Sequence, residues 1–217
     1  MGKVSSYLNY FADYNSEQAN KYHSWYESDK GKDIGYEQRE VLKVSLGDAR
    51  GRRLLDIGCG TGYFTSWFSK IGFCVVGIDS SEAMLHVARE KYGEGIEFMF
   101  GDAAQLPFGD RSFDVVVFAM SLEFTADAGA VIREAKRVAG SEIMLAMLNP
   151  DHPRNAERME KAESEGGVFL DAQLMRPKVL AKLFEDDGLW SGSLVVESDH
   201  SPYYILKTVR KETDEVN

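Results

Sequence analysis

The feature that most constrains this chain is a glycine-rich turn between an apolar run and an amphipathic stripe. Three glycines alternate from Gly58 to Gly62, directly after the short apolar run Arg53 to Ile57. Beyond the turn, apolar side chains between residues 64 and 71 recur at the spacing of one helix face. One glycine suffices for most tight turns, so three indicate a strand–turn–helix unit whose backbone is approached by a ligand.

Strand-like and helix-like runs alternate along most of the remaining chain. Near-continuous apolar strands separated by helices predict a parallel sheet that is covered on both faces. We therefore expect an α/β fold of three layers around a seven-stranded, mostly parallel sheet whose last strand is antiparallel. The expected strands are residues 53–57, 73–78, 96–100, 114–119, 143–148, 193–198 and 203–210.

The helices between these strands carry recognisable signals. Ser80 is expected to cap a helix that runs to about Lys91. Another helix should present one apolar face between residues 131 and 139. Pro177 suits the first turn of a further helix, whose inward side chains are expected to be Val179, Leu180, Leu183 and Phe184.

The chain of 217 residues fits a single domain that spans residues 1–217. Two segments stand outside the alternation of strands and helices. Residues 1–35 are rich in tyrosine and charge, and we expect them to form a helical cap. Residues 149–175 are polar and are expected to be an insertion on the substrate side. Both segments are candidates for covering a binding cleft.

Composition disfavours several classes of partner. The formal net charge is −10, so we expect no nucleic-acid partner. No window reaches the roughly 18 apolar residues of a membrane span, and the four scattered histidines have no metal-binding spacing. The two cysteines, Cys59 and Cys74, form no CxxC pair, which favours a reducing compartment and a cytoplasmic location.

The acid beside the glycine turn narrows the choice of ligand. A dinucleotide loop reads GxGxxG, whereas here the spacing is GxGxG and Tyr63 stands where the final glycine should be. Asp56 precedes the turn by two positions, and its carboxylate would repel a pyrophosphate but attract an ammonium group. The turn therefore favours S-adenosylmethionine, which has an ammonium group and no phosphate, over the cofactor of a nicotinamide-dependent oxidoreductase.

Two further acids follow the next two expected strands. Asp79 lies 21 positions after Gly58, where an acid at a strand end can accept hydrogen bonds from both ribose hydroxyls. Asp102 follows the third strand and can accept from the adenine amino group, while the Ala103 amide donates to a ring nitrogen. Three acids at the ends of successive parallel strands indicate one adenosine-binding edge.

These residues resemble the class I S-adenosylmethionine-dependent methyltransferases, in the small-molecule branch similar to the ubiquinone and menaquinone biosynthesis enzymes. The resemblance rests on "LLDIGCGTG" (54–62), "VVGIDSSEAML" (75–85), "GDAAQLPFGDRSFDVVVFAMSLEF" (101–124) and "REAKRV" (133–138). It implies a Rossmann-like fold and S-adenosyl-L-methionine as the methyl donor, with S-adenosyl-L-homocysteine as the product. The acceptor is then a small molecule that attacks the sulfonium methyl in line. The chain departs from the family in having "AGSEIML" in place of a Pro-Gly-Gly turn, and His23 where an A-x-x-Y-D motif has its acid.

The resemblance also assigns roles by position. Asp56 and the loop backbone would hold the methionine moiety, Asp79 the ribose, and Phe118 and Ala119 would line the methionine side. The full set of residues expected at the cofactor is Tyr22, Trp25, Asp56, Gly58, Cys59, Gly60, Thr61, Gly62, Asp79, Ser80, Met84, Asp102, Ala103, Phe118 and Ala119.

No catalytic residue is assigned from the sequence. The sulfonium already activates the methyl group, so a general base is needed only if the acceptor must lose a proton. His23, Glu123, His152 and His200 are the available bases, and a structural role is favoured for each. A protein or RNA methyltransferase, and a protein that binds the cofactor without turnover, remain alternatives. The sequence leaves open the identity of the acceptor, the atom that is methylated and the oligomeric state.

Overall fold

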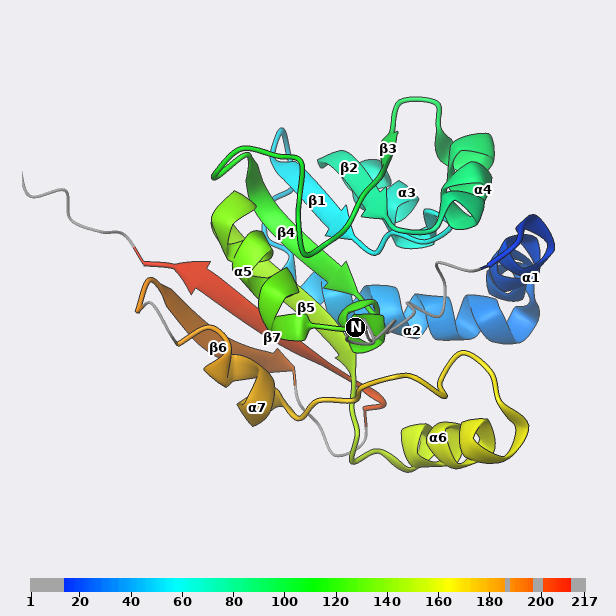
Figure 1. Ribbon diagram of the computed structural model, residues 1–217. Helices are drawn as coiled ribbons and strands as arrows, with labels where there is room; N and C mark the ends of the chain where they lie inside the picture. The colour runs from blue at the N-terminus through cyan, green and yellow to red at the C-terminus, as the bar shows by residue number, and fades with distance from the viewer. Residues whose placement is uncertain (1–13, 186–187, 197–200, 212–217) are drawn as a thin grey trace, which may run out of the picture.

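The computed structural model describes residues 14–185, 188–196 and 201–211 (Figure 1). Its strands form one seven-stranded sheet in the order β3-β2-β1-β4-β5-β7-β6. β7 runs antiparallel to both of its neighbours, and the other pairs are parallel, which confirms the predicted sheet. The strands are β1 (Arg53–Ile57), β2 (Cys74–Asp79), β3 (Glu97–Phe100), β4 (Phe113–Ala119), β5 (Ala139–Leu148), β6 (Trp190–Val196) and β7 (Tyr203–Arg210).

Helices cover both faces of the sheet, as predicted. Alternate residues of β1 show the two faces, because Leu54 joins the apolar cluster with α2 and α3 whereas Leu55 and Ile57 join the cluster with α5 and α7. The helical elements are α1 (Ser16–Glu27), α2 (Asp29–Ser45), α3 (Tyr63–Lys70), α4 (Glu82–Tyr92), the short 3-10 helix η1 (Leu122–Phe124), α5 (Ala128–Val138), α6 (Pro153–Glu165) and α7 (Pro177–Lys182).

The strand order creates a switch point beside β1. The chain places β2 and β3 on one side of β1 and then returns to place β4 on the other. Ligands in such sheets bind beyond the carboxyl ends of the strands at this reversal. The glycine turn that follows Ile57 therefore lies at the expected position for a ligand.

The predicted cap is confirmed as helical where the structure describes it. α1 begins at a capping box made by Asn15 and Gln18, and Ala19 packs against α4 (Figure 1). α2 continues beyond residue 35 to Ser45 and packs on the sheet through Leu42. Residues 1–13 of the expected cap lie outside the described residues.

Three local expectations are wrong. Ser81, and not Ser80, caps α4, because its hydroxyl accepts the Met84 N–H at 3.4 Å. Ala139 begins β5 instead of ending α5. Val179 does not point inward but is 54% exposed, because α7 buries the next residue, Leu180, and successive helix side chains point in different directions.

The segment 149–175 contains a helix that was not predicted. α6 is strongly polar, and its described side chains bury only Asn155 and Ala162. An ion pair of 3.1 Å between Arg154 and Glu37 joins α6 to α2. No helix among the residues that the structure describes has the length and apolar character needed to cross a membrane.

Candidate functional site

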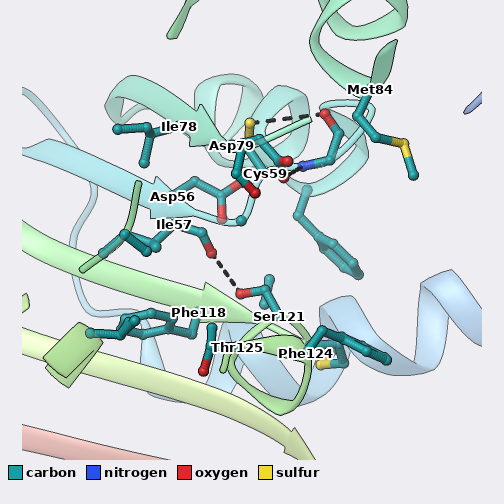
Figure 2. A pocket seen from close by; sticks show the side chains of 18 of the residues that line it. Asp56, Ile57, Cys59, Ile78, Asp79, Met84, Phe118, Ser121, Phe124 and Thr125 are labelled. Atoms are coloured by element: carbon teal, nitrogen blue, oxygen red, sulfur yellow. Dashed lines mark hydrogen bonds between the residues drawn. The ribbon is translucent and has the colours of Figure 1, made fainter. Parts of the chain in front are cut away.

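A cavity of about 460 Å³ opens at the switch point of the sheet. Its floor comes from the ends of β1 and β2, with Asp56 and Asp79, while Phe118 and Ser121 come from β4 and the loop that follows it (Figure 2). This volume lies within the range of sites for small ligands and cofactors. The cavity is therefore the candidate functional site.

The glycine turn bends tightly under this cavity. Gly58 has a φ of +74°, and an added Cβ would stand 2.6 Å from the Cβ of Ser121. Gly60 also has a positive φ, and nothing lies within 4 Å of where its Cβ would be. Gly58 is thus required by packing against the β4 loop, whereas Gly60 leaves the backbone bare toward open space.

Asp56 is a buried carboxylate with one oxygen free of protein partners. Its Oδ2 accepts the Thr65 hydroxyl at 2.7 Å, while Oδ1 is buried without a hydrogen-bond partner among the described residues. The pKa of Asp56 is raised to about 7, and burial is the main cause. The neighbouring Asp79 also raises this pKa, whereas the Thr65 hydrogen bond lowers it. Asp56 as a residue lines the cavity, and a buried carboxyl oxygen without a donor is suited to a cationic group of a ligand.

Asp79 fixes the loop from the neighbouring strand. Its Oδ2 accepts the Gly60 N–H and its Oδ1 accepts the Ser81 N–H, both at 2.8 Å. Burial raises its pKa, and these backbone donors oppose the shift. Each carboxylate oxygen retains a second lone pair for a ligand hydroxyl, so Asp79 can organise the loop and bind a ligand at once.

The third predicted acid lies at the rim of the cavity. Asp102 is exposed, and its Oδ1 accepts the Ala104 N–H at 2.8 Å. Ala103 lies beside it and also lines the cavity. The order of Asp56, Asp79 and Asp102 follows the order of the strands β1, β2 and β3 at one edge.

An aromatic wall closes another side of the cavity. We use this name for Tyr22, Tyr26, Tyr63, Phe64 and Phe124, all of which line it. The Tyr26 ring stacks on Tyr63 with centroids 4.1 Å apart, and Tyr22 and Tyr26 make an edge-to-face contact with centroids 5.7 Å apart. α1, the start of α3 and the β4 loop thus converge on one surface.

Most of the predicted cofactor residues meet in this cavity. Trp25 and Gly62 do not line it: Trp25 is 39% exposed and contacts the edge of Tyr26, and Gly62 is the N-cap of α3. The predicted residues that do line it are Tyr22, Asp56, Gly58, Cys59, Gly60, Thr61, Asp79, Ser80, Met84, Asp102, Ala103, Phe118 and Ala119.

The sequence analysis missed several residues of the site. Tyr26 lies four residues after Tyr22 on α1, so the two side chains share one face of the helix. This i, i+4 spacing is the signal that could have identified Tyr26. Met120 has a φ of +55°, which is unusual for a side chain other than glycine and is typical of functional turns. Ser121 anchors the same turn, because its hydroxyl donates to the Ile57 carbonyl at 2.6 Å. No sequence pattern identifies Met120 or Ser121.

The four available bases occupy structural positions where they are described. His23 is buried with its Nδ1 3.0 Å from the Thr61 hydroxyl, and desolvation lowers its pKa. His152 caps α6, since its Nδ1 accepts the Arg154 N–H. Glu123 is fully buried, and its Oε1 accepts the Leu148 N–H at 2.7 Å. His200 lies outside the described residues.

The charged side chains among the described lining residues are all acidic. Among the described residues that line the cavity, the ionisable acids are Asp56, Asp79, Asp102 and Asp127, and no lysine, arginine or histidine is present. A pyrophosphate would meet carboxylates without a compensating cation. A ligand with an ammonium group, sugar hydroxyls and an aromatic base fits the residues that are present.

The central part of the chain matches a known protein family. Residues 55–146 match the model of a methyltransferase domain. An O-methyltransferase, cnsE, from Penicillium expansum is 36% identical over 128 residues, which cover 55% of this chain and 46% of that protein. Demethylmenaquinone methyltransferase of Staphylococcus aureus is 36% identical over 129 residues, or 55% of this chain and 54% of that enzyme. The chain thus spans about half the length of the curated relatives it matches.

Solved structures share the fold over most of the chain. An S-adenosylmethionine-dependent methyltransferase from Thermotoga maritima has a TM-score of 0.72 and 17% identity, with 90% of this chain and 98% of that chain covered. Magnesium protoporphyrin IX methyltransferase from Synechocystis PCC 6803, with bound S-adenosylhomocysteine, has a TM-score of 0.69 and 23% identity, with coverage of 91% and 96%. At this identity, the likeness establishes a common fold.

Proposed function

We propose, because residues 55–146 match the model of a methyltransferase domain, that this chain transfers a methyl group from S-adenosylmethionine to a small-molecule acceptor. The observation that carries the proposal is Asp56, whose buried Oδ1 has no hydrogen-bond partner among the described residues. A cation is the ligand group that best stabilises such an oxygen. The α-ammonium group of the cofactor supplies one.

The remaining cofactor contacts follow the strand order. Thr65 donates to one oxygen of Asp56, and we propose that the other oxygen binds the methionine end. Asp79 is proposed to accept the ribose hydroxyls with its remaining lone pairs. Asp102 and Ala103 are proposed to bind the adenine at the rim. Phe118 and Ala119, at the end of β4, are proposed to line the methionine side.

When bound, the cofactor supplies a methyl group that its sulfonium already activates. The chain then has to orient the acceptor, exclude water and tolerate the loss of positive charge. The aromatic wall is suited to the first two tasks, because Tyr26 and Phe64 are buried, its other members are half-buried, and all of them line the cavity. No described lining residue is assigned as a general base, since the histidines are engaged elsewhere.

A small-molecule acceptor is favoured over RNA or protein. A surface that binds RNA needs cations for the phosphate backbone, and the described lining residues include none. The relatives named above act on demethylmenaquinone and magnesium protoporphyrin IX, which are small molecules. The acceptor of this chain is proposed to be of this general size, without a more specific identity.

Incubation of the full chain with methyl-labelled S-adenosylmethionine and a cell extract tests this proposal. We expect label in the small-molecule fraction, and no transfer by an Asp79→Ala variant that has the same melting behaviour. Label confined to protein or RNA would contradict the small-molecule proposal. Cofactor binding without transfer to any fraction would favour a binding protein.

We also propose a cytoplasmic location. Cys59 and Cys74 are both free thiols in the structure, which suits a reducing compartment. Fractionation of cells that produce the tagged chain measures this directly, and recovery in an oxidising or secreted fraction would contradict it.

A further inference from the structure

We propose that the acceptor of this chain binds as an uncharged, predominantly apolar molecule against the aromatic wall, and that carboxylate- or phosphate-bearing acceptors are excluded. This inference rests on the proposed function, because it concerns the second ligand of the same cavity. It specifies a chemical class that the family and the fold leave open. Its support comes from the composition, the packing and the electrostatic field of the cavity.

The first argument is the division of the lining residues. The three carboxylates at the ends of β1 to β3 are the proposed cofactor contacts, so the part left for an acceptor is the aromatic wall with Met120 and Thr125. Tyr26 and Phe64 are each only 7% exposed. The polar atoms here are hydroxyls, which can donate to and accept from a neutral group.

The second argument concerns two guanidinium groups that lie near this wall but do not line the cavity. Arg39 lies over the Tyr63 ring at 5.3 Å, and Arg158 lies over Phe169 at 5.5 Å. Phe169 in turn packs against Phe124, with centroids 6.2 Å apart. Neither guanidinium lines the cavity, so an anionic acceptor would lose its hydration without gaining a charged partner.

The third argument is the sign of the field inside. Tyr22 is a titratable group within the wall and responds to that field. Desolvation raises its pKa, the Tyr26 hydroxyl lowers it, and the charges of Asp79 and Glu123 raise it. The same burial and the same charges would disfavour an acceptor anion.

The fourth argument disfavours a cationic acceptor. The fourth lining acid, Asp127, is exposed and already caps α5 by accepting the Ala130 N–H at 2.9 Å. Asp56 is matched to the cofactor ammonium in the proposed function. A second cation would then meet mainly ring faces, and their attraction is weaker than the loss of its hydration.

Three probes of equal ring size test the inference: 1-naphthol, 1-naphthoate and 1-naphthylmethylammonium. Their dissociation constants are measured at pH 7 on the full chain with saturating S-adenosylhomocysteine. We expect 1-naphthol to bind at least tenfold more tightly than either ion. Equal or tighter binding of an ion would overturn the inference, as would a lack of binding by all three.

A charge introduced into the wall sharpens the test. Phe124→Lys should shift the ratio of naphthoate to naphthol affinity at least tenfold toward naphthoate, and Thr125→Lys serves if the first variant does not fold. Val179→Lys, on the exposed face of α7, is the matched control and should leave the ratio unchanged. An unchanged ratio in a folded wall variant would contradict placement of the acceptor there.

Failure of the proposed function is visible separately. Binding of S-adenosylhomocysteine is titrated first, without any probe. If it does not bind, the cofactor assignment fails, whatever the probes do. If it binds and the probe ranking is reversed, only the inference about the acceptor fails.

Discussion

Two regions of the molecule each bury a carboxyl group whose pKa is raised to about 7, yet they differ in what the group faces. The first region is the edge of the sheet that is proposed to bind the cofactor, which we call the cofactor edge. Here Asp56 lies at the end of β1 and lines the cavity. In the loop after β4, Glu123 is fully buried and does not line it. In both, burial is the main cause of the shift, and one oxygen has no hydrogen-bond partner among the described residues.

The difference lies in the elements that each carboxyl group joins. Glu123 connects three segments, because its Oε1 accepts the Leu148 N–H and its carbonyl accepts the Gln173 N–H at 2.7 Å. It thereby ties the β4 loop to β5 and to the segment 149–175. Asp56 instead has a side-chain partner, Thr65, and an open cavity. A raised pKa therefore indicates that a carboxyl group is buried. A buried carboxyl group that lines the cavity can contact a ligand, whereas one that does not line it has a structural role.

The largest effect is expected at Asp79, the other carboxylate of the cofactor edge. Asp79→Ala removes the proposed acceptor of two ribose hydroxyls and releases the Gly60 N–H. Hydrogen bonds to charged groups contribute about 1.5–3 kcal/mol each, so cofactor affinity should fall about 100-fold or more. Calorimetric titration measures this, with the exposed Asp151→Ala as control. Unchanged affinity in a folded Asp79 variant would remove it from the site.

Asp56→Asn should have the next largest effect. Loss of one charged partner for the ammonium group is expected to weaken cofactor binding by about tenfold to 100-fold. Because the pKa of Asp56 is about 7 without ligand and an ammonium favours the ionised form, wild-type affinity should rise from pH 6 to pH 8. Titrations across this range should show no such rise in the variant. A persistent pH dependence would assign the effect to another group.

Substitution of Glu123 should change the stability of the fold and leave cofactor affinity nearly unchanged. The folded pKa of Glu123 lies above its ordinary value of 4.5, so ionisation costs stability as the pH rises from about 4.5 through 7. Glu123→Gln keeps an acceptor for Leu148 and should stabilise the fold by about 1–2 kcal/mol at pH 8, and by less at pH 5. Denaturant unfolding at the two pH values measures this. A large loss of cofactor affinity in Glu123→Gln would contradict a purely structural role for Glu123.

The smallest effect is expected behind the aromatic wall. A Cβ at Gly35 would clash with the Tyr63 hydroxyl, so Gly35→Ala must displace that ring from its stack on Tyr26. We expect a severalfold weaker affinity for 1-naphthol and cofactor affinity within about twofold. Gly47→Ala, where the Cβ meets only the end of the Arg52 side chain at 3.9 Å, is the matched control. An unaltered probe affinity would show that the stack does not shape the acceptor space.

The sheet and the position of the acidic residues at its edge could be predicted because local patterns encode them. Parallel strands read as apolar runs, and their carboxyl ends must meet at one edge. Asp56 and Asp79 could therefore be placed together from chain order alone, and the structure has them at the ends of the neighbouring strands β1 and β2. The left-handed turn at Gly58 and Gly60 also follows from the glycine spacing.

The acceptor side could not be predicted because tertiary contacts define it. Tyr26 meets Tyr63 from a different helix, and Phe124 enters through a turn at Met120 that no residue pattern signals. α6 was missed because its polar sequence buries little. Ser80 and Ser81 are adjacent and chemically equivalent caps, so only the backbone geometry distinguishes them.

The most direct test of the account is a pair of calorimetric titrations at pH 8. S-adenosylmethionine and NADH are added separately to the wild-type chain, because the two share an adenosine and differ in ammonium against pyrophosphate. We predict one site for S-adenosylmethionine and no measurable heat of binding for NADH. Tight binding of NADH with no binding of S-adenosylmethionine would contradict the assignment of Asp56 and of the cavity.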